Sequence, residues 1–225
     1  MSKSLLFYVL ISAFGLFTTL MLALNMTTSL EEFPWRKPVV GSIFTLICLF
    51  GIAAAIMPKK CPAPTHFKGK GQTRIKGHHP DCKAFARHLI HVNGRVLCAA
   101  CSGLVLGAVI ALSGTLLYFF ANLEIGWIGF PLVLAGVASV VFGFSELRFR
   151  GTVRLLLNTL FVLGAFSILA GIDTLVQSLS IDLFVLVLIL FWLATRILLS
   201  QWDHSIICRG CRLSCPIEGV LVSSA

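Results

Sequence analysis

Six long apolar segments are the feature that most constrains how this chain can fold. A helix needs about 20 mostly apolar residues to cross the hydrocarbon core of a bilayer. Of the 225 residues, 57% are hydrophobic and only 12% are charged, a balance typical of proteins that cross the membrane several times. The apolar segments cover residues 5–24, 39–57, 102–121, 127–144, 155–172 and 183–199. We therefore predict an all-α fold, a polytopic membrane helix bundle with six transmembrane helices. We expect the first segment to be retained as a helix, because it lacks a small-residue cleavage site and is longer than the core of a signal peptide.

Positive charge is divided unevenly between the two faces that six spans create. Of the 18 Lys and Arg, 16 lie on the face that holds both termini, and only Arg36 and Lys37 lie on the other. Because Lys and Arg in short loops collect on the cytoplasmic side, this division predicts a multi-pass protein of the cell (cytoplasmic) membrane with both termini inside. The net charge of +9 then reflects a basic face beside anionic lipid headgroups. We expect the lipid bilayer as a partner and no specific nucleic acid, since the basic loop has no recognisable platform for stacking bases.

The spans divide the chain into four parts. Residues 1–57 carry the first two transmembrane helices, and residues 58–101 form a basic, Cys/His-rich cytoplasmic loop. Residues 102–200 carry helices three to six, and residues 201–225 form a Cys-rich cytoplasmic tail.

Part of the loop, GHHPDCKAFARHLIHVNG at residues 77–94, predicts a short helix on the membrane surface. Pro80 and Asp81 suit a first helical turn, and the Asn-Gly pair at its end suits a helix stop. Residues spaced by three and four would then share a face: Phe85, Leu89 and Val92 on an apolar stripe, and His88 and His91 on another face.

Cysteine and histidine follow the same division as positive charge. Seven of the eight Cys and all six His map to the predicted cytoplasmic face, and the exception, Cys48, is expected to pack inside the second span. Since the cytosol is reducing, thiols there are more often metal ligands or redox groups than structural disulfides. In the loop, Cys82, Cys98, Cys101 and one of the two histidines, His88 or His91, match the ligand set of a tetrahedral zinc.

The tail carries a second group of candidate ligands. His204 is followed by Cys208, Cys211 and Cys215, and the spacing of the first two cysteines is that of a zinc knuckle. The stretch CRGCRLSCP also matches the end of a bacterial ferredoxin motif without its first cysteine, so an iron–sulfur cluster would need a thiol from the loop.

Several arrangements of these ligands remain open. Loop and tail can each hold a zinc, or Cys98, Cys101, Cys208 and Cys211 can join around one zinc. The alternatives are an iron–sulfur cluster and redox thiols without a metal. Zinc is favoured because histidine is present and a complete four-cysteine ferredoxin run is not.

Residues around the Cys98–Cys101 pair resemble a known signature. From Cys82 to Gly107 the chain is similar to the domain of unknown function 2085 family, small prokaryotic membrane proteins with a cysteine-histidine pair, a phenylalanine, a glycine and a "LCARCTG" stretch before a membrane helix. The shared positions are Cys82, Phe85, Gly94, Leu97, Cys98, Cys101, Ser102, Gly103 and Gly107, about 30 residues of chain. Here Lys83 follows Cys82 where the family has histidine, and CAAC lacks the arginine. The resemblance implies a metal-type motif in a membrane protein and no particular reaction.

Taken together, these features predict a membrane protein with a Cys/His metal site on its cytoplasmic face that serves as a structural subunit or docks a protein partner. The alternatives are a redox subunit and a zinc-dependent enzyme acting on lipid, for which Asp81, Glu146 and Asp203 are the nearby cytoplasmic acids. Enzymatic activity and catalytic residues stay undefined, because no Walker, HExxH or Ser/His/Asp pattern is present.

Three expectations concern the spans themselves. The absence of Asp, Glu, Lys and His from all six segments argues against a proton relay. Gly103 and Gly107 predict close helix packing, and Arg196 is expected to reach the cytoplasmic interface.

Overall fold

The computed structural model describes residues 3–25, 33–57, 75–76, 79–80, 83–145 and 149–210. Six helices in this part of the chain are long and apolar enough to cross a membrane, as the sequence predicts. They are α1 (Lys3–Leu24), α2 (Arg36–Ile56), α3 (Ala99–Thr115) with the π-helical turn η3 (Leu116–Phe120), the 3-10 turn η4 (Gly126–Ile128) with α4 (Gly129–Phe144), α5 (Gly151–Val176) and α6 (Leu179–Gly210).

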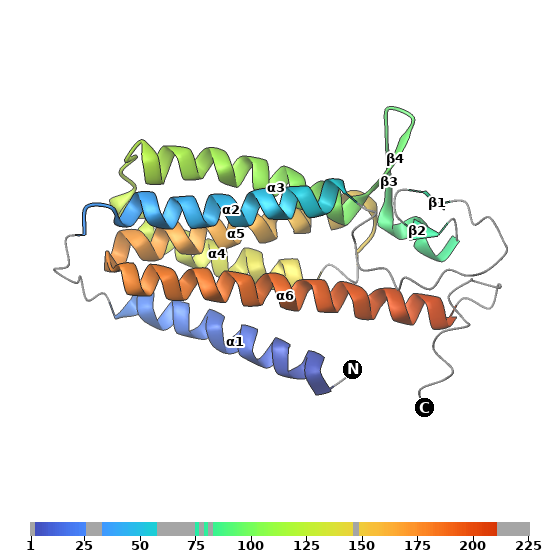
Figure 1. Ribbon diagram of the computed structural model, residues 1–225. Coiled ribbons are helices and arrows are strands. Elements are labelled where there is room, and N and C mark those ends of the chain that lie inside the picture. Colours follow the sequence, from blue (N-terminus) through green and yellow to red (C-terminus); the bar gives the residue numbers. More distant parts are fainter. Residues whose placement is uncertain are drawn as a thin grey trace.

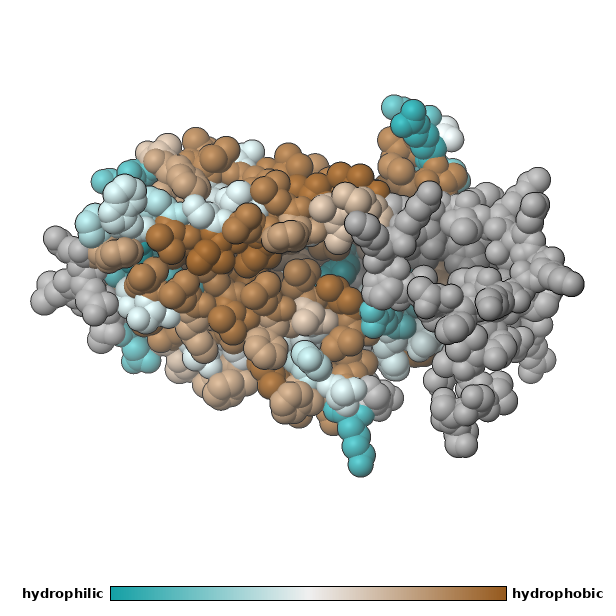
Figure 2. Space-filling view, viewed as in Figure 1, coloured by the Kyte–Doolittle hydropathy of each residue, from teal (hydrophilic) through white to brown (hydrophobic). Residues whose placement is uncertain are grey.

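The six helices lie side by side as one bundle, and the chain reverses direction between successive helices (Figure 1). We call the end at which α3 and α5 begin and α6 ends the hairpin end, because the strands β3 and β4 project there (Figure 1). The opposite end, where α2 begins and α5 passes into α6 through Gln177, is called the turn end. Figure 2 shows a broad apolar band over the middle of the bundle, as expected for a surface that faces lipid tails.

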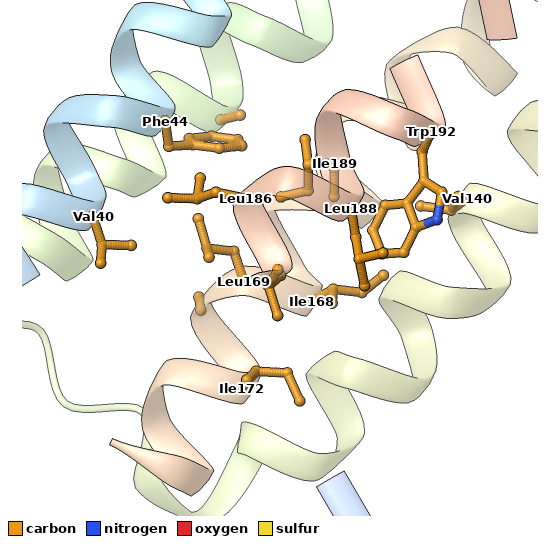
Figure 3. Close-up of a cluster of buried hydrophobic side chains, with 14 of the residues drawn as sticks. Val40, Phe44, Val140, Ile168, Leu169, Ile172, Leu186, Leu188, Ile189 and Trp192 are labelled. Atoms are coloured by element: carbon orange, nitrogen blue, oxygen red, sulfur yellow. The ribbon is translucent and has the colours of Figure 1, made fainter. Parts of the chain in front are cut away.

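Helix α5 lies at the centre of the bundle and is the most deeply buried of the six. Its apolar residues pack against α2, α4 and α6 in one continuous core (Figure 3). The core includes Phe44 of α2, Ile168 and Leu169 of α5, and Trp192 of α6, all less than 2% exposed. The Trp192 indole also donates to the Ser12 carbonyl at 3.3 Å and so joins α6 to α1.

Glycines bring α5 into backbone contact with its neighbours. A Cβ atom added to Gly103 would lie 2.2 Å from the Leu155 carbonyl oxygen, and one added to Gly107 would lie 2.8 Å from the Thr159 carbonyl oxygen. The Thr159 hydroxyl donates to the Gly103 carbonyl at 3.0 Å, a hydrogen bond that only such a close approach permits. The predicted close packing at the Gly103-x3-Gly107 pattern is confirmed.

Helices α5 and α6 are longer than the apolar segments that predict them. The segment 155–172 becomes Gly151–Val176, and 183–199 becomes Leu179–Gly210. The added turns carry charged residues, among them Arg154, Asp173 and Asp182, which are fully buried. A hydropathy criterion ends a span at such residues, but here they are paired inside the bundle and the helix continues through them.

The predicted surface helix over residues 77–94 is wrong. Lys83–His88 forms one short 3-10 helix, η2, and Leu89–Val92 then forms strand β3, antiparallel to β4 (Arg95–Cys98) with Leu89 opposite Cys98. Asn93 and Gly94 have φ values of 48° and 75°, so the pair makes the two-residue hairpin turn for which Asn-Gly is strongly preferred, rather than a helix stop. A second small antiparallel pair joins β1 (Ile75–Lys76) to β2 (His79–Pro80).

The change from helix to hairpin alters which side chains are inside. Phe85 and His88 are buried, whereas Val92 is 45% exposed and His91 is exposed on β3. The predicted apolar stripe and the shared face of His88 and His91 are therefore absent. Of these two histidines, only His88 lies in the interior.

Candidate functional site

Cys98 and Cys101 lie at the point where the hairpin meets the membrane helix α3. Cys98 is the last residue of β4 and the N-cap of α3, and Cys101 lies in the first turn of that helix. The Cys98 side chain is buried, and Cys101 is half-buried. The first N–H groups of a helix lack intrahelical acceptors and create a positive potential, which favours the thiolate form of a nearby cysteine. This placement of the pair is as the sequence predicts.

His88 is next to this junction because of the hairpin register. Since Leu89 is opposite Cys98, the preceding residue His88 lies beside the passage from Cys98 into α3. The His88 side chain is only 1% exposed, and its ring centroid lies 5.4 Å from that of Phe85 in an edge-on contact. The loop thus folds back onto the end of the bundle instead of lying flat on the membrane.

The extension of α6 meets the loop at this point. Figure 1 shows α6 continuing past the end of α4 toward the hairpin. The His204 ring on this extension lies 5.2 Å from the His88 ring and 5.6 Å from the Phe85 ring, centroid to centroid. His88 and His204 are thus the described residues at which the loop and the extension of α6 come into contact.

A buried ion pair supports the His88 ring from within the bundle. Arg154, at the start of α5, is fully buried, and its Nη1 lies 3.3 Å from His88 Nε2 and 3.4 Å from Asp203 Oδ2. Asp203 Oδ2 is itself 3.5 Å from His88 Nε2. The ring thus lies between one guanidinium and one carboxylate, and neutral imidazole is the form of histidine that binds metals.

The tautomer of His88 depends on which of these two groups it bonds. When Nε2 carries a lone pair, it accepts a hydrogen bond from Arg154, and the ring proton is on Nδ1. When Nε2 carries the proton, it donates to the Asp203 carboxylate, and Nδ1 has a lone pair available for a metal. The second state is the carboxylate–histidine arrangement that orients many metal-bound histidines.

The structure places four of the eight predicted site residues at the hairpin end, and two of them, His88 and His204, are in ring contact. The four are Cys98, Cys101, His88 and His204. Cys208 belongs to the last turn of α6, and only its backbone is described. The remaining candidates lie outside the described residues: Cys82, Cys211 and Cys215.

Within the described ranges, no three His, Cys, Asp or Glu side chains are grouped closely enough to hold a metal ion. A zinc at this place would therefore need ligands from the cysteines whose side chains are not described. The donor types that are in place, thiol and imidazole, are those that zinc prefers in proteins. Cys48, expected to be a packing residue, is buried in α2 at 5% exposure.

Arg154 is the part of this site that the sequence interpretation misses. It belongs to a predicted loop, yet it continues the buried face of α5, since Asn158, Phe161 and Ala165 follow it at spacings of four, three and four. That periodicity is the signal that would have placed Arg154 inside. The Asn158 amide donates to the Arg154 carbonyl at 2.6 Å.

Two further predictions about the spans are overturned. Asp173 of α5 and Asp182 of α6 are fully buried near the turn end, so the spanning helices do contain interior acids. Arg196 does not reach the interface, because α6 continues to Gly210 and the Arg196 side chain is 3% exposed, with its guanidinium 5.9 Å from the centre of the Phe161 ring. In both cases the polar side chain lies inside the bundle rather than at its surface.

Comparison of the chain with known protein families, with curated proteins and with solved structures finds no match. The geometry of the residues themselves therefore carries the functional argument.

Proposed function

We propose that this protein is a cytoplasmic-membrane protein whose hairpin end is closed by a bound metal, for which zinc fits best, and that the closed end docks a partner protein. The observation that carries the proposal is the buried contact of His88 with His204 beside Cys98 and Cys101. It joins two segments far apart in the sequence, each of which carries cysteines. The resemblance of residues 82–107 to the domain of unknown function 2085 family remains part of the proposal on the sequence pattern alone.

The ligands would come from both segments. Cys98, Cys101 and one ring nitrogen of His88 or His204 would supply part of a tetrahedral set, and Cys82, Cys208, Cys211 and Cys215 are the candidates for the rest. When bound, the metal supplies a crosslink between the loop, α3 and α6. A structural zinc contributes about 10–16 kcal/mol to the folding of a small peptide that binds it.

Burial favours a structural site over a catalytic one. Catalytic zinc keeps an open coordination position, whereas structural zinc is enclosed by protein ligands. His88 and Cys98 are 1% and 7% exposed, and Asp203, the acid next to His88 among the described residues, is engaged by Arg154. A lipid-hydrolysing site would need an accessible metal and a general base that is not already paired.

The docking role rests on the hairpin. Beyond its buried base, the hairpin exposes Val92 and Leu97, which are 45% and 40% exposed. The hairpin that carries them projects from the bundle (Figure 1), at the end that the charge division assigns to the cytoplasm. A cytoplasmic protein partner could pack against these apolar side chains, and the bound metal would hold the hairpin that carries them rigid.

Elemental analysis of the purified full-length protein tests the proposal. We expect stoichiometric zinc in the natural protein and in Cys48→Ser, and loss of the metal in the Cys98→Ser/Cys101→Ser double variant. The Cys48 variant is the matched control, since this cysteine is buried in α2. A full complement of zinc in the double variant, or no metal in protein purified without chelators, would contradict the proposal. Visible absorbance with bound iron would instead favour the redox alternative, because zinc is colourless.

The orientation has its own test. Reporter fusions after Met57 and at the C-terminus should both report a cytoplasmic location, since 16 of the 18 Lys and Arg lie on that face. If both fusions reported a periplasmic location, the hairpin end would lie on the periplasmic side instead.

A further inference from the structure

A buried group of charged residues occupies the turn end of the bundle. It joins Arg36 at the start of α2 to Asp173 near the end of α5 and Asp182 in the first turn of α6. Both aspartate side chains are 0% exposed, and the Arg36 side chain is 11% exposed. This cluster is at the opposite end from the proposed metal site and is independent of it.

The tight connection between α5 and α6 brings the two carboxyl groups together. Gln177 adopts a left-handed φ of 55° and ends α5, and the Asp182 N–H then donates to the Ser178 carbonyl at 3.0 Å as α6 begins. One nitrogen of Arg36, Nη1, lies between the two acids: it donates to Asp173 Oδ1 and, at 2.9 Å, to Asp182 Oδ2. Two carboxyl groups thus share a single guanidinium.

The two carboxyl oxygens that do not contact Arg36 differ in their hydrogen bonding. Asp173 Oδ2 accepts a hydrogen bond from the Tyr118 hydroxyl at 2.6 Å, and that hydroxyl also lies 2.6 Å from Thr174 Oγ1. Asp182 Oδ1 is buried and has no hydrogen-bond partner among the residues that the structure describes. A buried carboxylate oxygen without a donor is costly, and so the site lacks one positive group.

The charge balance leads to the same conclusion. Two carboxylates and one guanidinium leave one uncompensated negative charge in a site that water barely reaches. The Lys37 ammonium lies 4.6 Å from the centre of the Tyr118 ring, so its contact here is with the aromatic face. Helices α1 and α4 bring no titratable side chain to this end within the described residues.

The site needs a hydrogen-bond partner for the carboxyl oxygens and one additional positive charge. A proton supplies both better than a metal ion does. Metal cations such as Ca²⁺ need six or more oxygen ligands, whereas here three of the four carboxyl oxygens are already engaged by Arg36 and Tyr118. A proton needs only one oxygen and one acceptor, and two close carboxyl groups readily share one.

We propose that the Asp173–Asp182 pair is a proton-binding site that holds one exchangeable proton, with Arg36 as its fixed counter-charge and its contact with solvent. The proton belongs to the pair and not to either residue alone. Because Arg36 is the member with residual exposure, exchange takes place at the turn end, on the side of the membrane away from the hairpin. The two acids lie one residue outside the apolar segments 155–172 and 183–199, so a search of those segments alone does not find them.

Infrared spectroscopy of the full-length protein in lipid nanodiscs tests this directly. At neutral pH, we expect the C=O stretching band of one protonated carboxyl group per chain, and this band should shift in D₂O. Labelling the side-chain carboxyl of aspartate with ¹³C should move the band and so assign it to Asp rather than Glu. This measurement uses the natural protein and does not depend on the folding of any variant.

Substitutions then locate the proton. Asp182→Asn and Asp173→Asn should each abolish the band, because either change leaves one carboxylate paired with one guanidinium. Glu124→Gln is the matched control, since Glu124 is an exposed acid at the same end, and it should leave the band unchanged.

Three results would overturn the proposal. They are the absence of a protonated-carboxyl band in the natural protein at neutral pH, a band that does not move with aspartate labelling, and a band that persists in both single Asn variants. A thermal midpoint that rises with Na⁺ or K⁺ but not with choline, and does so only while Asp182 is present, would also overturn it by identifying a metal cation as the occupant.

Discussion

The rings of His88 and His204 lie 5.2 Å apart, centroid to centroid, although one belongs to the loop before α3 and the other to the end of α6. Their contact fixes the position of the last helical extension relative to the hairpin. Phe85 lies against both rings, so the three side chains form one small aromatic cluster, and its His88 ring contacts Arg154 and Asp203. The cluster is thus the link between the transmembrane bundle and the Cys/His-rich segments.

His88→Ala should loosen this link. The substitution removes a buried ring and leaves either the Arg154 guanidinium or the Asp203 carboxylate without one hydrogen-bond partner, so we expect a cost of about 1–3 kcal/mol. His91→Ala is the matched control, since His91 is exposed on the neighbouring strand, and it should change stability by no more than about 0.5 kcal/mol. Thermal unfolding in detergent, together with limited proteolysis of the hairpin, compares the two. Equal effects of the two changes would contradict a supporting role for His88.

The sequence predicts the six spans well because burial in lipid demands nothing more than length and apolarity. It misplaces the ends of α5 and α6 for a physical reason: Arg154, Asp173 and Asp182 are charged, and hydropathy alone cannot show that each has a partner on another helix. Pairings of this kind depend on which helices are neighbours. That information is absent from any single segment.

The hairpin shows how one pattern can support two structures. Phe85, Leu89 and Val92 have helical spacing, but Asn93-Gly94 between short runs of apolar residues is equally a signal for a two-residue hairpin. The pairing of β3 with β4 decides in favour of the strands. The position of Cys98 and Cys101 at the start of α3 could be predicted, because it depends only on where the apolar segment begins. The contact between His88 and Arg154 could not.

Gly103→Ala should disrupt the bundle itself. The new Cβ would lie 2.2 Å from the Leu155 carbonyl oxygen, which belongs to the backbone of α5 and cannot move aside easily. Overpacking of this kind costs about 1–3 kcal/mol. Gly51→Ala is the control, because a Cβ on Gly51 of α2 would meet nothing within 4 Å. Denaturation with SDS in mixed micelles should show a clear loss of stability for Gly103→Ala only, and an unchanged midpoint for that variant would show that α3 and α5 are not in close contact.

Arg154 and Asp203 should be energetically coupled. Arg154→Met leaves the Asp203 carboxylate without the guanidinium beside it, and we expect a cost of about 3 kcal/mol, the lower end of the range for a broken buried pair, because Asp203 retains 13% exposure. Asp203→Asn alone removes the carboxylate that lies beside the buried guanidinium. The double variant removes both charges, so its cost should fall short of the sum of the single costs by at least about 1 kcal/mol. The measurement is a double-mutant cycle of unfolding free energies, and strict additivity would show that the two charges do not interact.

The same carboxylate leads to a prediction about metal binding that rests on the proposed zinc site. Asp203 faces Nε2 of His88, so a metal on this ring would be bound through Nδ1, with the Nε2 proton donated to Asp203. Asp203→Asn keeps the size of the side chain but removes the negative charge that holds this tautomer. Loss of such an outer partner typically weakens metal affinity by about 10–100-fold without removing a ligand. Titration of the zinc-loaded, full-length protein with a competing chelator should show this drop for Asp203→Asn and no change for Glu124→Gln, an exposed acid at the opposite end. Affinity equal to that of the natural protein would mean that His88 does not bind the metal through Nδ1 with Asp203 as its partner.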